Sequence, residues 1–236
     1  MKRHDLKIAV VNFSGNVGKS TIARHLLSPR MPHAPVVAVE TINSDGMGEV
    51  MVKGADFGRL QEELLLQDSA IVDVGASNIE QFLSLMRMYR GSHQDFDLFV
   101  VPCVPELKQQ KDTIECVYAL SALGVEASKI CVVFNMVDVN SDLEEVFGPL
   151  LRFAQAEAKC RVDIRAAIPK NELFAWLRGL PSSIQSILDD PRDFKEEIKR
   201  AKDSDERLDL AKNLTMQRMA QGVQENLDQV FGVLIP

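Results

Sequence analysis

The sequence lacks the features that define disulfide-rich, zinc-binding and membrane-spanning proteins. Its four cysteines, Cys103, Cys116, Cys131 and Cys160, form no Cys-x-x-Cys pair, so a zinc knuckle or thioredoxin-type motif has no support. No run of about 18 apolar residues occurs, and the charged start MKRHDLK leads into no apolar signal-peptide segment. We therefore expect a cytoplasmic protein with reduced cysteines and no membrane span.

An excess of positive charge is also absent, because 27 Lys and Arg stand against 34 Asp and Glu, for a formal net charge of −7. Such a chain is not an obvious general binder of nucleic acid or anionic membranes. Residues 192–218 are rich in Lys and Arg, but acids are interleaved with them. The pairs Glu196/Arg200 and Asp203/Arg207 have the i,i+4 spacing of helix-surface ion pairs. This spacing favours a solvated helix face over a patch for nonspecific DNA binding, although both interpretations stay open.

What the sequence does contain, up to about residue 170, is an alternation of short apolar runs with longer amphipathic stretches. The runs are continuous rather than alternating, which is typical of strands covered by helices on both faces. They span residues 7–12, 35–40, 69–74, 96–102, 129–135 and 162–169. The helical candidates between them span residues 20–27, 57–66, 79–89, 106–123 and 142–158. The alternation predicts an α/β fold with three layers and a mainly parallel sheet.

The pattern changes after Pro169, where the strand-like runs stop. Residues 171–190 are broken by Gly179 and Pro181, and residues 191–232 combine many charges with helical spacing of apolar residues. We expect a helical C-terminal portion rather than a clearly separate domain. The predicted organisation is a single domain over residues 1–236, with an α/β core at 1–170 and a helical extension at 171–236.

The first apolar run leads into the sequence FSGNVGKS at residues 13–20. This segment fits the phosphate-binding P-loop pattern GxxxxGK[ST], except that Phe13 replaces the first glycine. Glycines let backbone N–H groups curl around phosphate oxygens, and the start of the following helix favours an anion. Lys19 would meet the β- and γ-phosphates, and Ser20 would ligate Mg²⁺. The predicted nucleotide-binding residues of the loop are Gly15, Asn16, Val17, Gly18, Lys19, Ser20 and Thr21.

Two further segments fit a nucleotide site. Asp73 ends the apolar run at residues 69–74 and suits a carboxylate that holds Mg²⁺ through water, although it could merely cap the next turn. Asn135 ends the fifth run, where an amide could read the edge of a base, and adenine fits better than guanine because Met136 interrupts the guanine-specific NKxD pattern. An ordinary turn asparagine is the alternative there. Pro169 follows the last run and is expected to wall in the base.

The glycine-rich loop resembles the deviant Walker A motif of ParA/MinD-type ATPases, GKGGxGK[ST]. In that family a signature lysine follows the first glycine and reaches a partner's nucleotide, but here Ser14 stands at that position and Asn16 replaces the next glycine. The family's second strand ends in DxD, whereas this chain has Glu40 and Ile42, with Asp45 as a candidate substitute. Asp45 fits an ordinary turn equally well. With Lys19, Glu40 and Asp45 as candidate catalytic residues, the departures predict slow ATP hydrolysis.

Beyond the loop, the chain looks like the plasmid-borne StbB/TraL group of ParA-like ATPases. The resemblance rests on VNFSGNVGKSTIARHLL, IVDVGASN at 71–78, CVVFN at 131–135, the run AAIP at 166–169 and the helical tail. It implies an ATP- or ADP-bound, Mg²⁺-dependent P-loop NTPase that acts in plasmid stability, positioning or conjugative DNA transfer. It also implies a homodimer and a plasmid-encoded DNA-binding or transfer protein as the partner.

Two alternative functions remain. The first is a nucleotide-binding interaction module without turnover, which the departures at Ser14 and Ile42 favour. The second is a small-molecule kinase or ATP-dependent synthetase of the same fold. A kinase would need an acceptor pocket with a basic lid, for which MRMYRGSH at residues 86–93 is the nearest candidate.

Overall fold

The computed structural model describes residues 5–40, 50–53, 56–178 and 183–235. The chain divides into two compact units, which we describe separately. The first unit comprises Met1–Lys170 together with Gln229–Pro236, and the second comprises Asn171–Asp228. The last residues of the chain thus return to the first unit. The prediction that residues 1–236 form a single domain stays a prediction.

The first unit is built on a sheet of seven strands in the order β3-β2-β4-β1-β5-β6-β7. Every neighbouring pair is parallel, which confirms the predicted α/β class. The strands are β1 (Lys7–Val10), β2 (Val36–Glu40), β3 (Val50–Lys53), β4 (Ala70–Val74), β5 (Leu98–Cys103), β6 (Ile130–Val137) and β7 (Ala167–Pro169). The sequence did not predict β3, a strand of only four residues at the edge of the sheet.

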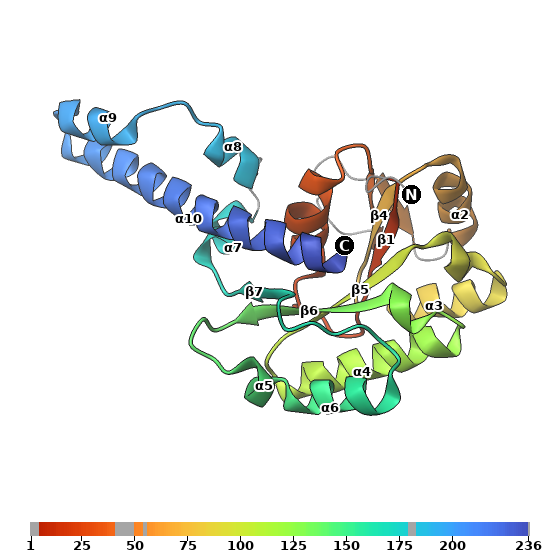
Figure 1. Cartoon of the computed structure of the whole chain (residues 1–236). Coiled ribbons are helices and arrows are strands. Elements are labelled where there is room, and N and C mark those ends of the chain that lie inside the picture. The colour runs from red at the N-terminus through yellow and green to blue at the C-terminus, as the bar shows by residue number, and fades with distance from the viewer. Residues whose placement is uncertain (1–4, 41–49, 54–55, 179–182, 236) are drawn as a thin grey trace. The chain divides into compact units, whose positions relative to one another are not determined.

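Helices cover both faces of this sheet. In Figure 1, α4 and α6 lie on one side of it and the helical segment that follows β1 lies on the other. The helices are α1 (Lys19–Thr21), the π-helical η1 (Ile22–Leu27), α2 (Phe57–Leu66), α3 (Ile79–Met88), α4 (Leu107–Ala122), α5 (Leu143–Val146) and α6 (Gly148–Glu157). Short 3₁₀ turns are η2 (Ser28–Arg30), η3 (Ser92–Asp95) and η4 (Ala127–Lys129). The helix expected over 142–158 is broken at Phe147, because Pro149 starts a new helix rather than continuing the old one.

The core explains why the apolar runs are continuous. All residues of β4 and β5 are buried, so neither face of these strands needs polar side chains. One side of the sheet carries a series of aromatic contacts, with ring centroids 5.5 Å apart for Phe57–Phe82, 6.4 Å for Phe82–Phe96 and 5.2 Å for Phe96–Phe99. These rings join α2 and α3 to the strands beneath them.

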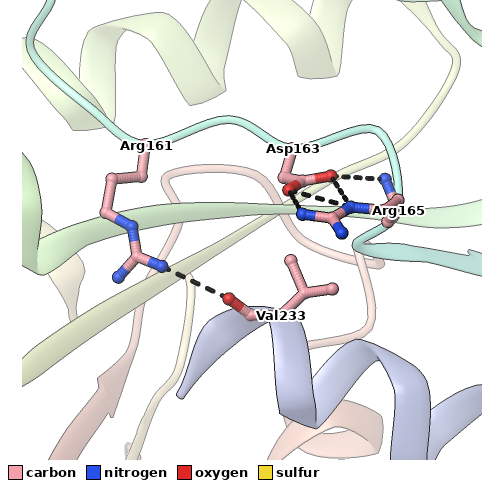
Figure 2. Close-up of polar contacts among 4 residues, drawn as sticks. All are labelled: Arg161, Asp163, Arg165 and Val233. Atoms are coloured by element: carbon pink, nitrogen blue, oxygen red, sulfur yellow. Dashed lines mark hydrogen bonds and ion pairs between the residues drawn. The ribbon is translucent and has the colours of Figure 1, made fainter. Parts of the chain in front are cut away.

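The end of the longest helix, α10 (Ser204–Leu234), is fastened to the first unit by Arg161. Figure 2 shows this guanidinium pointing at the last turn of the helix. It donates to the carbonyl oxygens of Val233, at 3.3 Å, and Leu234, at 3.5 Å. A cation at a helix C-terminus satisfies carbonyls that have no partner within the helix and complements the helix dipole. Arg161 itself is held beside β6 by a backbone bridge to Cys131.

Helices are the only regular secondary structure in the described residues of the second unit. It contains α7 (Glu172–Leu177), α8 (Ile184–Leu188), α9 (Phe194–Arg200) and most of α10. Side-chain caps start all four of these helices. Asn171 accepts from the N–H of Leu173, and Ser183 forms a capping box with Ser186. Asp193 accepts from the N–H of Glu196, and Asp203 accepts from the N–H of Glu206. The predicted helical C-terminal portion is thereby confirmed. Within the parts of the chain that the structure describes, no helix is long and apolar enough to cross a membrane.

Candidate phosphate-binding site

The loop between β1 and α1 has the backbone shape that the glycine-rich sequence predicts. Gly18 has φ +89°, and a Cβ there would lie 2.1 Å from Nδ2 of Asn135. Asn16 also has a positive φ, 58°, which asparagine tolerates better than most residues. A Cβ at Gly15, by contrast, would meet nothing within 4 Å. Of these two glycines, Gly18 is therefore the one that the local geometry requires.

Lys19 lies at the start of α1, and its side chain is buried beneath this loop. Its Nζ donates to the carbonyl oxygen of Ser14 at 2.8 Å and to that of Asn12 at 3.3 Å. Burial lowers the pKa of Lys19, while the nearby carboxylate of Asp73 opposes that change and Glu40 adds to the opposition. Because a buried ammonium is costly unless it is hydrogen-bonded or paired, its placement indicates a site built for charge.

Asp73 and Glu40 lie at the same edge of the sheet as Lys19. Asp73 is buried near the end of β4, in register with Val10 of β1 and Ala38 of β2. Glu40 ends β2 and is half-buried. The structure therefore gathers three predicted site residues at the carboxyl ends of adjacent strands, which is where ligands bind in open α/β sheets.

The predicted Mg²⁺ ligands fit a metal that is held largely by phosphate. Ser20 is on α1, and α1 packs against β4, the strand that carries Asp73. Among the described residues no group of three or more His, Cys, Asp or Glu could hold a metal ion alone. Mg²⁺ usually binds through one or two protein groups, several waters and the phosphates of a substrate. Ser20 and Asp73 match that requirement, and their role stays a prediction.

Asn135 has a structural contact that the sequence did not predict. Its side chain is buried, and Nδ2 donates to the carbonyl oxygen of Val17 at 2.8 Å. The residue thus fastens β6 to the phosphate loop. Its proposed reading of the base stays a prediction. Pro169 lies beside Val137 where β6 and β7 end together, and the N–H of Lys170 donates to the carbonyl of Val137 at 2.8 Å.

A second set of polar contacts joins the loop to α4. Asn12 is fully buried, and its Nδ2 donates to the carbonyl of Pro102 and to Oγ1 of Thr113, each at 2.8 Å. The hydroxyl of Ser14 donates to Oδ2 of Asp112. Sequence reasoning missed Asn12, Asp112 and Thr113 as site residues. A polar residue closing an apolar strand marks Asn12, but nothing distinguishes Asp112 or Thr113 within an amphipathic helix.

Two further predictions concern the switch residues and a candidate lid. Ile42 and Asp45 lie outside the described residues. The candidate lid at residues 86–93 is anchored near both ends, since Met86 lies in the core and the Ser92 hydroxyl donates to the Met86 carbonyl at 3.2 Å, while residues 87–90 are exposed. That segment is therefore the end of α3 and the turn η3.

No protein-family model matches this sequence, and no curated protein matches it either. Solved structures do match it. MinD from Aquifex aeolicus, a cell-division protein, aligns with TM-score 0.51 and 14% identity over 89% of this chain and 96% of that chain. The fold is that of MinD.

Two other structures agree. The Pyrococcus furiosus cell-division ATPase MinD aligns with TM-score 0.51 and 15% identity, over 89% of this chain and 98% of its own. A variant of McdA from Cyanothece, in complex with ATP, aligns with TM-score 0.50 and 15% identity, over 95% of this chain and 97% of its own. At such low identity these similarities show only that this chain has the fold of MinD and McdA. Its chemistry has to be argued from its own residues.

Proposed function

We propose that this chain binds ATP with Mg²⁺ at the loop after β1 and works as a nucleotide-dependent molecular switch with slow ATP hydrolysis. One observation carries the proposal: Lys19 is buried beneath a glycine-shaped loop, with Asp73 and Glu40 beside it at the carboxyl edge of a parallel sheet. Lysine, backbone N–H groups and a metal-holding carboxylate are what a triphosphate requires.

Each residue has a distinct part in this proposal. Lys19 meets the β- and γ-phosphates, and the backbone N–H groups of residues 15–21 surround them. Ser20 and Asp73 would hold Mg²⁺, which would supply positive charge to offset that of the phosphates. Asn135 and Pro169 border the base. ADP binds the same residues after hydrolysis.

We propose slow turnover because this chain lacks some of the groups that orient water and stabilise charge in ParA/MinD-type ATPases. Ser14 stands where the ParA/MinD-type loop has its signature lysine, and its hydroxyl is engaged with Asp112 of the same chain. We propose Glu40 as the residue that positions the attacking water, with Asp45 as a second candidate.

We infer a cytoplasmic homodimer of the StbB/TraL kind that serves plasmid stability, positioning or conjugative transfer. A plasmid-encoded DNA-binding or transfer protein would be its partner. The fold shared with MinD and with ATP-bound McdA supports this inference.

A nucleotide-binding module without turnover is the second candidate. The contact between Ser14 and Asp112 favours it, because residue 14 is occupied within its own chain. This candidate predicts tight binding of ATP with no release of phosphate under any condition.

The test is a titration with a fluorescent ATP analogue and Mg²⁺, paired with phosphate release, for the wild type and Lys19→Gln. Glutamine keeps a donor for the loop carbonyls but removes the charge, so we expect binding about tenfold weaker or worse. Lys108→Ala, which removes an exposed lysine of α4, is the matched control and should bind like the wild type.

The outcomes separate the candidates. Phosphate release that plasmid DNA or a partner stimulates, and that Lys19→Gln abolishes, supports the switch. Binding without release under every condition supports the non-hydrolysing module. Equal binding by the wild type and Lys19→Gln would contradict both.

A further inference from the structure

Ser14 is buried although it lies in a loop, and all its polar groups are hydrogen-bonded. Its N–H donates to Oδ1 of Asn12 at 2.8 Å, and its carbonyl accepts from Nζ of Lys19 at 2.8 Å. Its hydroxyl donates to the carboxylate of Asp112. Residue 14 therefore joins the end of β1, the phosphate-binding lysine and helix α4.

The contact with α4 is reinforced by the neighbouring residue pair. Thr113, which follows Asp112, accepts from Nδ2 of Asn12 at 2.8 Å and donates to the carbonyl of Gln109 at 2.8 Å. Two consecutive residues of α4 thus hold two residues that lie about a hundred positions earlier in the chain. Hydrogen bonds to an ionised carboxylate are about twice as strong as neutral ones, and partly buried networks of this kind fix one geometry.

The Lys19–Ser14 bond links this junction to the residue expected to meet phosphate. A phosphate oxygen that binds the ammonium of Lys19 would compete with the carbonyls that hold it. A backbone shift at Ser14 would also move its hydroxyl, which is bonded to Asp112. Such a shift would reach α4, a helix of 16 residues.

We propose that the Ser14–Asp112 contact positions the phosphate loop and transmits nucleotide occupancy to α4, with Asp112 as a positioning residue. The inference rests on the proposed nucleotide binding, but it names a different element, α4, as the reporter of the bound state. It also implies that residue 14 is held within its own chain and needs no second copy to fix it.

The test is hydrogen exchange of α4 with and without Mg²⁺ and the nonhydrolysable analogue AMP-PNP, at saturating ligand for each variant. In the wild type the ligand should slow exchange both in the loop and across residues 107–122. In Ser14→Ala and Asp112→Ala, the loop should still be protected, but most of the slowing in α4 should be lost. AMP-PNP should bind each of these variants about tenfold more weakly.

Three comparisons distinguish this role from simple stabilisation. The double variant Ser14→Ala/Asp112→Ala should be no weaker than either single variant, because both remove one interaction. Asp112→Asn keeps an acceptor oxygen for Ser14 and should retain the α4 response. Glu115→Ala removes the same charge from an exposed position on α4 and should behave like the wild type.

The outcomes that oppose the inference are equally distinct. An α4 response in Ser14→Ala equal to the wild type at the same occupancy would overturn it, as would strictly additive losses in the double variant. If AMP-PNP protects neither the loop nor α4 in the wild type, the proposed nucleotide binding fails first, and the transmission to α4 fails with it.

Discussion

The two units of the chain use polar side chains in opposite ways. In the first unit, side-chain hydrogen bonds around the phosphate loop join distant parts of the sequence: 118 positions separate Asn135 from Val17, and 101 separate Asn12 from Thr113. In the second unit they are mostly local. Lys212 and Asp209, for example, are three positions apart on one helix.

The buried contacts of the first unit fix the positions of distant segments, whereas the exposed contacts of the second unit lie on a solvated surface. Asn12 and Asn135 are buried, so each bond they make replaces water and fixes two segments together. The Lys212–Asp209 pair leaves 60% and 72% of the two side chains exposed, and such pairs contribute little to stability. The predictions below test this contrast, beginning with the largest expected effect.

The largest effect is expected for Gly18→Ala. The added methyl group would strain a backbone with φ +89° and would meet the Asn135 amide at 2.1 Å, displacing it from Val17. We expect a loss of about 3 kcal/mol in the free energy of unfolding, measured by urea denaturation, together with loss of ATP binding. Gly15→Ala is the control, because nothing lies within 4 Å of its added Cβ. Equal stability of both variants would show that the loop is not fixed from β6.

Acid should destabilise the first unit through His25. Burial, with a smaller effect of Arg24, lowers the pKa of His25 from its usual 6.5 to about 4. Between these values the unfolded chain binds a proton that the folded chain does not, so stability is full above about pH 7 and falls as the pH drops. At pH 5 the loss should be about 2 kcal/mol.

Urea denaturation of the wild type and His25→Gln at pH 7.5 and pH 5 measures this effect. The variant should lose distinctly less stability than the wild type on acidification. An identical loss in both proteins would place the acid-sensitive group elsewhere.

Much of the fold could be predicted because its signals are local. Six apolar runs located six of the seven strands, and helical spacing located α2, α3 and α4 to within a residue or so. The four-residue edge strand β3 was missed because its apolar run, at residues 50–52, is only three residues long and ends at Lys53. The final residues of α10 were assigned to the helical extension, yet they belong to the first unit. Helical periodicity does not reveal which body a helix end contacts.

The candidate site was predictable only in part, for the same reason. The run Gly18-Lys19-Ser20 and the strand-ending Asp73 are recognisable because their chemistry is carried within a few residues. The Ser14–Asp112 contact joins residues 98 positions apart, so it exists only once β1 and α4 are packed together. Such contacts need the fold before they can be inferred.

A gain in stability is expected for Met136→Gly. Met136 has φ 56°, at a register shift between β6 and β7, and its side chain is 38% exposed. A residue with a side chain pays roughly 1 kcal/mol for this conformation, so glycine should raise the free energy of unfolding by up to about 1 kcal/mol. Met136→Ala keeps the strain and is the control in the same urea experiment. If both variants lose stability equally, the methionine side chain matters more than its backbone.

The smallest effect is expected for Lys212→Ala in the second unit. The lysine contacts Asp209 at 2.9 Å, but both side chains are largely exposed, so the free energy of unfolding should change by less than about 0.5 kcal/mol. The same variant also tests the choice between a solvated helix face and a DNA-binding patch. If the face is only solvated, Lys212→Ala should leave the retention of the chain on duplex DNA at low salt unchanged. A weaker retention with a shallower dependence on salt would instead show that this helix contacts DNA phosphates. The two units would then differ in the ligand that each one binds, a nucleotide in the first and DNA in the second.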